Sequence, residues 1–398
     1  MNLKNSNVLI LFFTLIVIMM GFGMIIPIMP FYVKNLGASG SILGFLMATY
    51  GVMQFIFAPF WGQLSDRYGR KKIIMLGVLG NAISQVLFGL STQLWMLFAA
   101  RIFSGMLSSA TLPTAMAFIS DSTTREQRGG GMGIIGAAFG IGMVIGPGLG
   151  GWLASESLSL PFFVSGALSL VAFVLIAMML PESLPAEKRT SGTSKFRGPQ
   201  LKLMWTSLFG PLGFLLFLAF LLTFGLTNFE AIFGLYSADR YSYTPKLVGI
   251  LFMVIGITSA FVQGVLTGPL TRRWGEVTVI RGSLIASAAG FVFLVQAGSL
   301  PAVIAAISFF IVSNAMLNPA NSALISKRTE SQQGLLMGLN NSYQSLGRII
   351  GPAWAGLVYD INLNFPYWSG ALIFLTGFIL SMLLLNREVQ PVELGTTD

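Results

Sequence analysis

The chain has no cysteine and no histidine, and only 9% of its residues are charged. Without cysteine there is neither a disulfide framework nor a thiol nucleophile, and the most usual zinc and haem ligands are also missing. No Gly-Lys-Ser/Thr phosphate loop occurs, which argues against a single-chain ATP-driven pump. We expect no enzymatic activity and no metal or cofactor.

The composition is instead strongly apolar. Hydrophobic residues make up 54% of the 398 positions, and the mean hydropathy is +0.78. A soluble chain carries about 25% charged residues, so too few polar residues are present here to cover a soluble surface. Runs of about 20 apolar residues recur along the chain, each long enough to cross a bilayer. We therefore expect an all-α polytopic membrane protein.

The apolar runs between polar breaks predict twelve membrane spans. The predicted spans cover residues 7–29, 42–61, 73–91, 95–119, 131–154, 159–180, 208–236, 247–268, 277–297, 302–325, 333–358 and 365–386. The first run lacks a small-residue cleavage site, so we expect it to remain as a span. Because residues 181–206 are polar, basic and rich in Pro, Gly and Ser, they predict a cytoplasmic linker between six-helix halves at 1–180 and 207–398.

The placement of lysine and arginine predicts the orientation. With the N-terminus inside, 18 of the 23 basic residues fall on the cytoplasmic side, whereas only Lys34, Arg240 and Lys246 fall outside. The positive-inside rule predicts this asymmetry, with both termini in the cytoplasm and the spans in the cytoplasmic membrane. The net charge of +9 then reflects topology and attraction to anionic lipid, and we expect no nucleic-acid partner.

The two halves carry repeated motifs. At a shift of 205 residues, a set of Gly and Pro positions in the fifth span coincides with the eleventh span, and at 206 residues "GQLSDRYG" (62–69) coincides with "GPLTRRWG" (268–275). The first set pairs Gly133, Gly142, Gly146, Pro147 and Gly151 with Gly338, Gly347, Gly351, Pro352 and Gly356. Parallel repeats of this kind are typical of transporters in which one half rocks against the other around a site near the midplane.

The loop between the second and third spans reads "GQLSDRYGRKK" (62–72) and resembles the signature loop of the major facilitator superfamily. Gly62 and Gly69 favour tight turns, and Arg67 lies among basic residues that face the cytoplasm. The resemblance implies a charge lock between Asp66 and Arg70. The alternative is an ordinary solvated basic loop.

A third residue joins the predicted lock. Asp121, at the end of the fourth span, is a plausible partner for Arg70. In the second copy of the loop, Arg272 takes the position of Asp66, so any lock there must differ.

The fifth span carries a second family motif. Its small residues allow close helix packing in lipid, and its proline favours a kink. The pattern comprises Gly133, Gly142, Gly146, Pro147, Gly150 and Gly151. It resembles the antiporter signature of the superfamily, which implies export of a substrate in exchange for protons. Ordinary small-residue packing is the alternative reading.

Three ionisable residues are predicted inside spans: Arg101, Glu230 and Arg348. Each is costly in hydrocarbon and should face a cavity or a partner. "FAARIFSG" around Arg101 and "TNFEAIF" around Glu230 resemble multidrug exporters of the NorA and Bmr type, a likeness that runs from residue 7 to 386. We expect Glu230 to couple transport to protons together with Arg101 and to sense cationic substrates in the cavity; a structural salt bridge is the alternative.

Two departures from that resemblance concern the cavity. Where those exporters commonly carry an acid in the tenth span, this chain has Asn314 and Asn318, and Arg348 replaces an uncharged polar residue in the eleventh. We hypothesise that Arg348 approaches Glu230 as a counter-ion, which would favour less cationic substrates. Further cavity candidates, some of which must face other helices, are Gln54, Asn340, Asn341 and Gln344.

The resemblance predicts a proton-coupled exporter of hydrophobic drugs or small amphiphiles, working by alternating access as a monomer in lipid. The proton gradient would be the energy source, and protons and hydrophobic small molecules the partners. Two alternatives stay open. One is a narrow-range exporter of a metabolite, a sugar or a single antibiotic, and the other is a membrane sensor that does not transport.

Overall fold

The computed structural model describes residues 6–123, 128–189, 198, 200–328 and 333–385. Within these ranges every regular element is a helix. Some residues used in the topology and repeat predictions lie outside the described residues: Lys4, Arg125, Gln127, Lys195, Arg197, Gln332 and Arg387.

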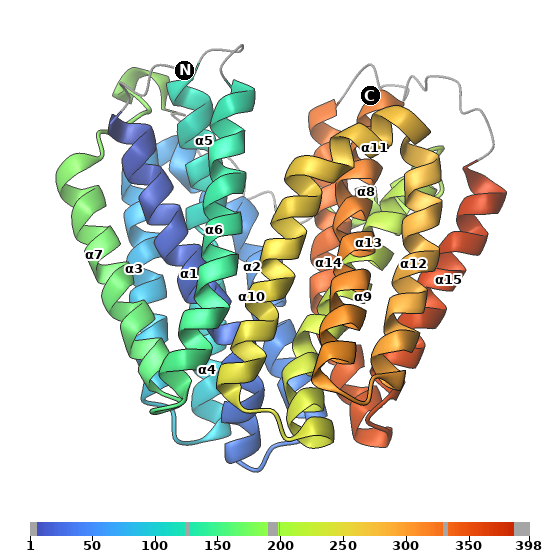
Figure 1. The fold of residues 1–398 in the computed structure, drawn as a ribbon. Coiled ribbons are helices and arrows are strands. Elements are labelled where there is room, and N and C mark those ends of the chain that lie inside the picture. Colours follow the sequence, from blue (N-terminus) through green and yellow to red (C-terminus); the bar gives the residue numbers. More distant parts are fainter. Residues whose placement is uncertain (1–5, 124–127, 190–197, 199, 329–332, 386–398) are drawn as a thin grey trace. The chain divides into compact units, whose positions relative to one another are not determined.

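The first seven helices follow the order of the predicted spans (Figure 1). They are α1 (Ser6–Asn35), α2 (Gly40–Tyr68), α3 (Arg70–Gly89), α4 (Leu94–Ser108), α5 (Thr111–Ser122), α6 (Arg128–Ala154) and α7 (Leu160–Met179). The predicted fourth span is divided between α4 and α5, which continue one another as a single span from Leu94 to Ser122.

The remaining elements begin with two short ones that the sequence did not predict. These elements are η1 (Ala186–Lys188), α8 (Leu201–Leu208), α9 (Gly213–Tyr241), α10 (Pro245–Phe261), η2 (Val262–Leu266), α11 (Thr267–Trp274), α12 (Glu276–Gln296), α13 (Leu300–Lys327), α14 (Gln333–Ile361) and α15 (Phe365–Leu384). The seventh span begins at Gly213 rather than at 208, because α8 takes up the residues before it. The π-helical turn η2 joins α10 and α11 into one span.

Eleven helical segments of the described residues are long and apolar enough to cross a membrane. The eleventh predicted span, 333–358, is not among them, although α14 has 29 residues. Its polar residues lower its hydropathy; they include Asn340, Asn341, Gln344 and Arg348. The architecture is a polytopic all-α membrane fold, and side chains such as Met178 and Leu372 lie at 80% and 64% exposure on its apolar outer surface.

The helices form two compact units. The first comprises the described parts of Met1–Pro199 and Gly234–Gly256, and the second those of Gln200–Phe233 and Ile257–Asp398. The boundaries fall inside α9 and α10, whose segments 234–256 belong to the first unit. Division of the chain into halves at 1–180 and 207–398 stays a prediction, because the units do not follow it at these two helices.

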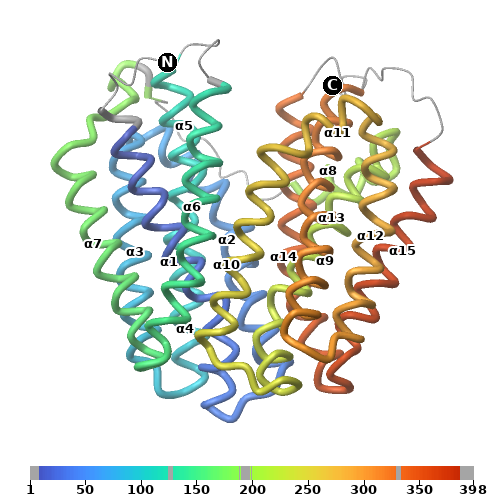
Figure 2. The backbone as a smooth tube through the Cα atoms, in the orientation of Figure 1, coloured from blue at the N-terminus to red at the C-terminus, as the bar shows by residue number. Residues whose placement is uncertain are grey.

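In the first unit, α1 packs against α6 and α7, and α3 packs against α4 and α7 (Figure 2). The contact between α1 and α6 is made backbone to backbone at glycines. A methyl group on Gly142 would lie 2.7 Å from the Met20 nitrogen, and one on Gly150 would lie 2.9 Å from the Met24 Cα. Helices in lipid associate through such close van der Waals contact.

Gly151 faces a different neighbour within the same unit. A methyl group there would lie 2.9 Å from the Cα of Gly249 in α10. Gly133, by contrast, has open space around it. In the fifth-span motif, one row of glycines therefore packs against α1, and the last glycine, Gly151, packs against α10.

The second unit repeats the first of these contacts. Gly347 of α14 lies against α9, where a methyl group would meet the backbone of Phe220 and Phe224 at 2.8 Å. On its other side α9 joins an aromatic core in which Phe291 and Phe310 stack at 4.4 Å. The members of this core are at most 1% exposed: Phe229, Phe291, Phe310, Tyr367 and Phe374.

The α1–α6 contact predicts the effect of a single methyl group. Gly146→Ala places Cβ against the Met20 carbonyl oxygen and 3.1 Å from the Gly23 Cα, both backbone atoms that cannot turn aside. We expect overpacking to lower stability by about 1–3 kcal/mol, measured by unfolding of the purified protein in mixed micelles. Gly140→Ala is the control, since nothing lies within 4 Å of a methyl group there. Equal stability of the two variants would contradict the packing argument.

Candidate functional site

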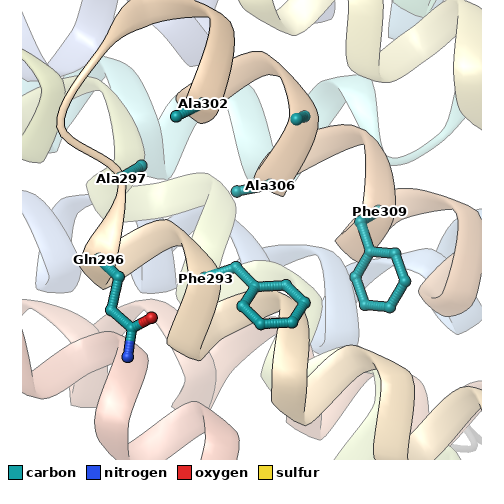
Figure 3. A pocket seen from close by; sticks show the side chains of 7 residues that line it. Phe293, Gln296, Ala297, Ala302, Ala306 and Phe309 are labelled. Carbon is teal, nitrogen blue, oxygen red and sulfur yellow. The ribbon is translucent and has the colours of Figure 1, made fainter.

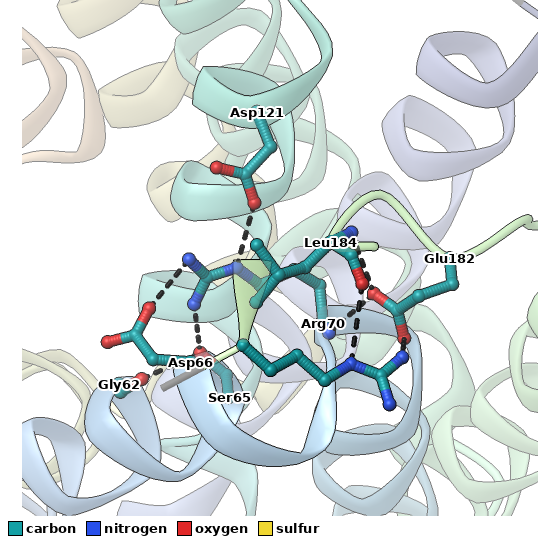
Figure 4. A network of polar contacts seen from close by, with 8 residues as sticks. Gly62, Ser65, Asp66, Arg70, Asp121, Glu182 and Leu184 are labelled. Atoms are coloured by element: carbon teal, nitrogen blue, oxygen red, sulfur yellow. Dashed lines mark hydrogen bonds and ion pairs between the residues drawn. The ribbon is translucent and has the colours of Figure 1, made fainter. Parts of the chain in front are cut away.

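A buried arginine organises the turn between α2 and α3 (Figure 4). The Arg70 side chain is 8% exposed and lies 2.7 Å from Asp66, one turn earlier. Its Nε donates to Asp121 Oδ2 of α5 at 2.9 Å, and its Nη1 donates to Ser65 Oγ at 2.6 Å. The structure thus brings together the three residues of the predicted lock, and it adds the Ser65 hydroxyl.

A further carboxylate completes this network, and sequence reasoning missed it. Glu182, just after α7, accepts from the Arg70 backbone N–H at 2.7 Å and from the Leu184 N–H at 3.2 Å. It thereby caps the first turn of α3, which has no side-chain cap of its own. A signal was present, since "PES" (181–183) follows the sixth span on the predicted side of the Gly69 turn.

The turn itself requires glycine. Gly69 has φ +99°, a left-handed conformation that side chains disfavour, and its N–H donates to the Ser65 carbonyl at 3.1 Å. Gly62 lies inside α2 and not in a turn, so the prediction of a tight turn there is wrong; its carbonyl accepts from Ser65 Oγ at 2.7 Å. Arg67 is exposed and lies over the Tyr68 ring, 5.4 Å from its centre. The network fixes the ends of α2, α3 and α5 and the start of the chain after α7.

Arg101 of α4 is buried among apolar groups in the first unit. It is 3% exposed, and its Nη2 lies 2.8 Å from the Met47 sulfur. Its guanidinium stands 5.5 Å from the ring centres of both Tyr50 and Phe88. Such cation–π contacts partly replace the lost hydration. Gln54, half-buried on α2, belongs to the same unit.

In the second unit the predicted polar residues lie in two rows. Asn314 and Asn318 are four apart on α13, and Ser322 continues that face. Asn340 of α14 donates to Ser322 Oγ at 3.5 Å, and Gln344 and Arg348 follow Asn340 at steps of four.

The helices α13 and α14 run in opposite directions (Figure 1). From the contact between Ser322 and Asn340, the row on α13 therefore runs towards lower residue numbers beside the row on α14, which runs towards higher ones. Asn314 and Arg348 are then each eight residues, about 12 Å, further along. Asn314 and Asn340 are 3% and 2% exposed, and Asn314 Nδ2, Asn318 Oδ1 and Asn340 Oδ1 are buried without a hydrogen bond to the described residues. Buried amide groups of this kind are suited to a polar ligand.

Glu230 lies beside the α14 row. Thr227, one turn earlier on α9, donates to the Gly347 carbonyl at 3.0 Å, which joins the two helices next to Arg348. Glu230 is half-buried and Arg348 is exposed. Glu230 and Arg348 therefore lie on neighbouring helices of one unit, close to the hydrogen bond that joins these helices.

A separate hollow of about 440 Å³ lies between α12 and α13 (Figure 3). It is lined by two phenylalanines, Gln296 and four alanines, and Phe293 and Phe309 within it are 49% and 43% exposed. None of the predicted site residues lines it, and it holds no charge. We therefore place the candidate site at the polar rows and Glu230 rather than here.

Comparison with known proteins gives the family. A model of the Major Facilitator Superfamily matches residues 11–352 and 216–396. The chain belongs to the Major Facilitator Superfamily. Membership makes it a transporter rather than an enzyme. Members of this superfamily generally need no cofactor, and the described residues hold no cluster of three or more possible metal ligands.

Several curated members are similar over nearly their whole length. Multidrug resistance protein 2 of Bacillus subtilis is 34% identical over 99% of both chains. Quinolone resistance protein NorA of Staphylococcus aureus is 31% identical over 98% of this chain and 99% of its own. Multidrug resistance protein 1 of Bacillus subtilis is 32% identical over 96% and 97%.

Solved structures of other transporters share the fold. The nucleoside transporter NupG (D323A mutant) matches with a TM-score of 0.79 and 14% identity, covering 96% of this chain and all of that one. A bacterial homolog of the human lysosomal transporter Spinster matches with a TM-score of 0.75 and 16% identity, covering 98% and 99%.

The Arg70 network predicts the effect of removing one carboxylate. Asp121→Asn keeps the side-chain shape but removes the charge 2.9 Å from Arg70, so a buried guanidinium loses one of its ionic partners. We expect unfolding in mixed micelles to be easier by about 1.5–3 kcal/mol. Arg67→Gln, which changes an exposed charge of the same loop, should have no comparable effect. If both variants unfold alike, Asp121 does not stabilise the network.

Proposed function

We propose that this protein exports hydrophobic drugs or small amphiphiles across the plasma membrane in exchange for protons. The observation that carries the proposal is full-length similarity, at 31–34% identity, to bacterial multidrug and quinolone resistance proteins. The proton gradient supplies the energy, and no cofactor takes part. Both termini lie in the cytoplasm, as the distribution of lysine and arginine predicts, and the transporter works as a monomer.

Glu230 is the proton-coupling carboxylate in this proposal. It lies well inside α9 and beside Arg348, whose charge acts on it. A carboxylate that exchanges a cationic neighbour for hydrocarbon or water changes its affinity for a proton, so a conformational cycle can load and unload it. Arg101 supports coupling from the first unit as a buried cation held by Met47 and two rings.

The polar rows of α13 and α14 form the substrate-facing surface of the second unit. Asn314, Asn318, Asn340 and Gln344 offer neutral donors and acceptors, and Arg348 adds a positive charge. Because the row holds a cation and amides rather than further acids, it favours neutral, zwitterionic or acidic amphiphiles over strong cations. Gln54 is the corresponding candidate in the first unit.

The remaining motif residues serve the conformational cycle. The α6 glycines keep α1 and α6 in contact, and the Arg70 network holds the ends of α2, α3 and α5 as one block. Both arrangements let a half move as a body rather than deform.

The proton-coupling assignment is tested by Glu230→Gln. In proteoliposomes with an imposed pH gradient, we expect the variant to lose drug-dependent proton movement almost completely, because the amide cannot carry a proton. Size-exclusion behaviour and binding of an uncharged drug in detergent should persist, which shows that the fold remains. Glu187→Gln, at an exposed carboxylate outside the spans, is the matched control.

Unchanged proton-driven export by Glu230→Gln would overturn the assignment. Absence of any flux from the wild type, together with indifference to the substitution, would instead support a non-transporting sensor.

The charge of Arg348 predicts a shift in substrate range. Arg348→Gln removes the cation beside Glu230, so export of a permanent cation such as tetraphenylphosphonium should rise by roughly ten-fold relative to an acidic amphiphile, a change of about 1.4 kcal/mol. Arg240→Gln, in the last turn of α9, is the control for the loss of one positive charge elsewhere in the protein. Drug-susceptibility panels and vesicle uptake measure the ratio, and an unchanged ratio sinks this role. Protection against a single chemical class in either protein would favour the narrow-range exporter.

A further inference from the structure

The turn between α11 and α12 repeats the geometry of the turn between α2 and α3. Gly275 has φ +77° and donates its N–H to the Thr271 carbonyl at 3.0 Å, as Gly69 does to Ser65 at 3.1 Å. Each glycine directly precedes the next long helix. The two turns are separated by 206 residues, so they occupy equivalent places in the two repeats.

At that same separation, the three charges of the Arg70 network are all inverted. Asp66 corresponds to Arg272, Arg70 corresponds to Glu276, and Asp121 corresponds to Lys327. The neighbouring Arg67 corresponds to Arg273 and keeps its sign. The inversion thus involves the positions of the network and not the basic character of the loop.

The inverted residues also make the equivalent contact. Lys327, the last residue of α13, donates to Glu276 Oε1 at 2.5 Å, and Glu276 is the first residue of α12. In the first unit Arg70, the first residue of α3, reaches Asp121 in the last turn of α5. We propose that Glu276 and Lys327 form a second, charge-inverted lock that fixes the start of α12 to the end of α13 during transport, with Arg272 in the place of Asp66.

Helix electrostatics explains why the second lock needs fewer partners. A helix N-terminus carries partial positive charge, so Arg70 at the start of α3 is unfavourable there and is surrounded by Asp66, Asp121 and the capping carboxylate of Glu182. Glu276 at the start of α12 is favoured by the same field, and one lysine suffices. The second ion pair also lies nearer to solvent. The side chains of Lys327 and Glu276 are 65% and 14% exposed, against 26% and 8% for Asp121 and Arg70.

The position of the lock determines its effect. It joins α12 to α13, two neighbouring helices of one unit, near the end of α13 where the polar row of that helix begins at Ser322, and its ion pair includes none of the proposed substrate residues. Glu276 and Lys327 are therefore positioning residues: their loss should slow the conformational step without weakening drug binding. The inference rests on the proposed function only where transport is the readout.

The first test measures geometry without requiring transport. Because the full-length chain has no cysteine, Thr278→Cys on α12 and Ser326→Cys on α13 can be spin-labelled without a background. The distance distribution between the labels should be narrow in the parent and broad after Glu276→Lys or Lys327→Glu, since like charges then face each other. It should narrow again in the double swap Glu276→Lys/Lys327→Glu.

The second test measures transport and binding for the same variants. Each single reversal should lower the maximal export rate by roughly two- to five-fold, the size that a partly exposed ion pair supports, with drug affinity unchanged. The double swap should recover most of the rate, and adding Arg272→Glu should recover more, since that triple variant has the charge order of the first lock. Arg273→Glu, with the same charge change as Lys327→Glu, is the matched control for altered topology.

The outcomes separate the two proposals. A double swap no better than either single reversal, in both label distances and rate, would overturn the lock. Single reversals that leave the label distribution narrow would overturn it as well. A parent protein with no drug-dependent proton movement would refute the proposed function, while the label distances would still decide the lock.

Discussion

Close contact between helix backbones at glycine is the constraint on which the rest of this structure depends. In hydrocarbon, no hydrophobic force drives apolar helices together, so contact area must come from backbones that approach closely. Gly142 and Gly150 provide that contact between α6 and α1, and Gly347 provides it between α14 and α9. The equivalent helix pairs of the two repeats are therefore held by the same device.

The polar groups depend on these contacts for their location. The Thr227–Gly347 hydrogen bond forms because α14 lies against α9, and Arg348 follows Gly347 directly while Glu230 lies one turn after Thr227. In the first repeat the equivalent of Arg348 is Met143, so the same helix contact there carries no charge. One framework thus supplies a neutral packing surface in one half and a charged surface in the other.

The sequence predicted the helical membrane fold, the repeat and the family, because each rests on a pattern within a short window or on a fixed shift. It also named two of the partners of Arg70, Asp66 and Asp121. Other features lay beyond its reach. Glu182 reaches α3 from a segment with no periodic pattern, and nothing local in α8 distinguishes it from the linker around it.

The inverted triplet at the α11–α12 turn shows the same limit. The sequence alone shows that Arg272 replaces an acidic residue of the first loop. The equivalence of Lys327 and Asp121 becomes informative only when the structure places both at helix ends beside a turn. Long-range contacts of single side chains carry no periodicity, so only the fold reveals them. The roles proposed for Glu230, Arg101 and the amide rows likewise rest on where these residues lie and on their chemistry.

The low hydropathy of α14 has a consequence for how the protein is made. A central arginine alone makes insertion of an isolated helix less favourable by about 2.5–3.5 kcal/mol, and three amide side chains add to that penalty. Synthesis proceeds from the N-terminus at roughly 5–20 residues per second, so α9 has emerged from the ribosome seconds before α14. Thr227 of α9 and Ser322 of α13 are then available as hydrogen-bond partners for α14. Entry of α14 into the bilayer is thus an assembly step, guided by helices already there rather than by its own affinity for lipid.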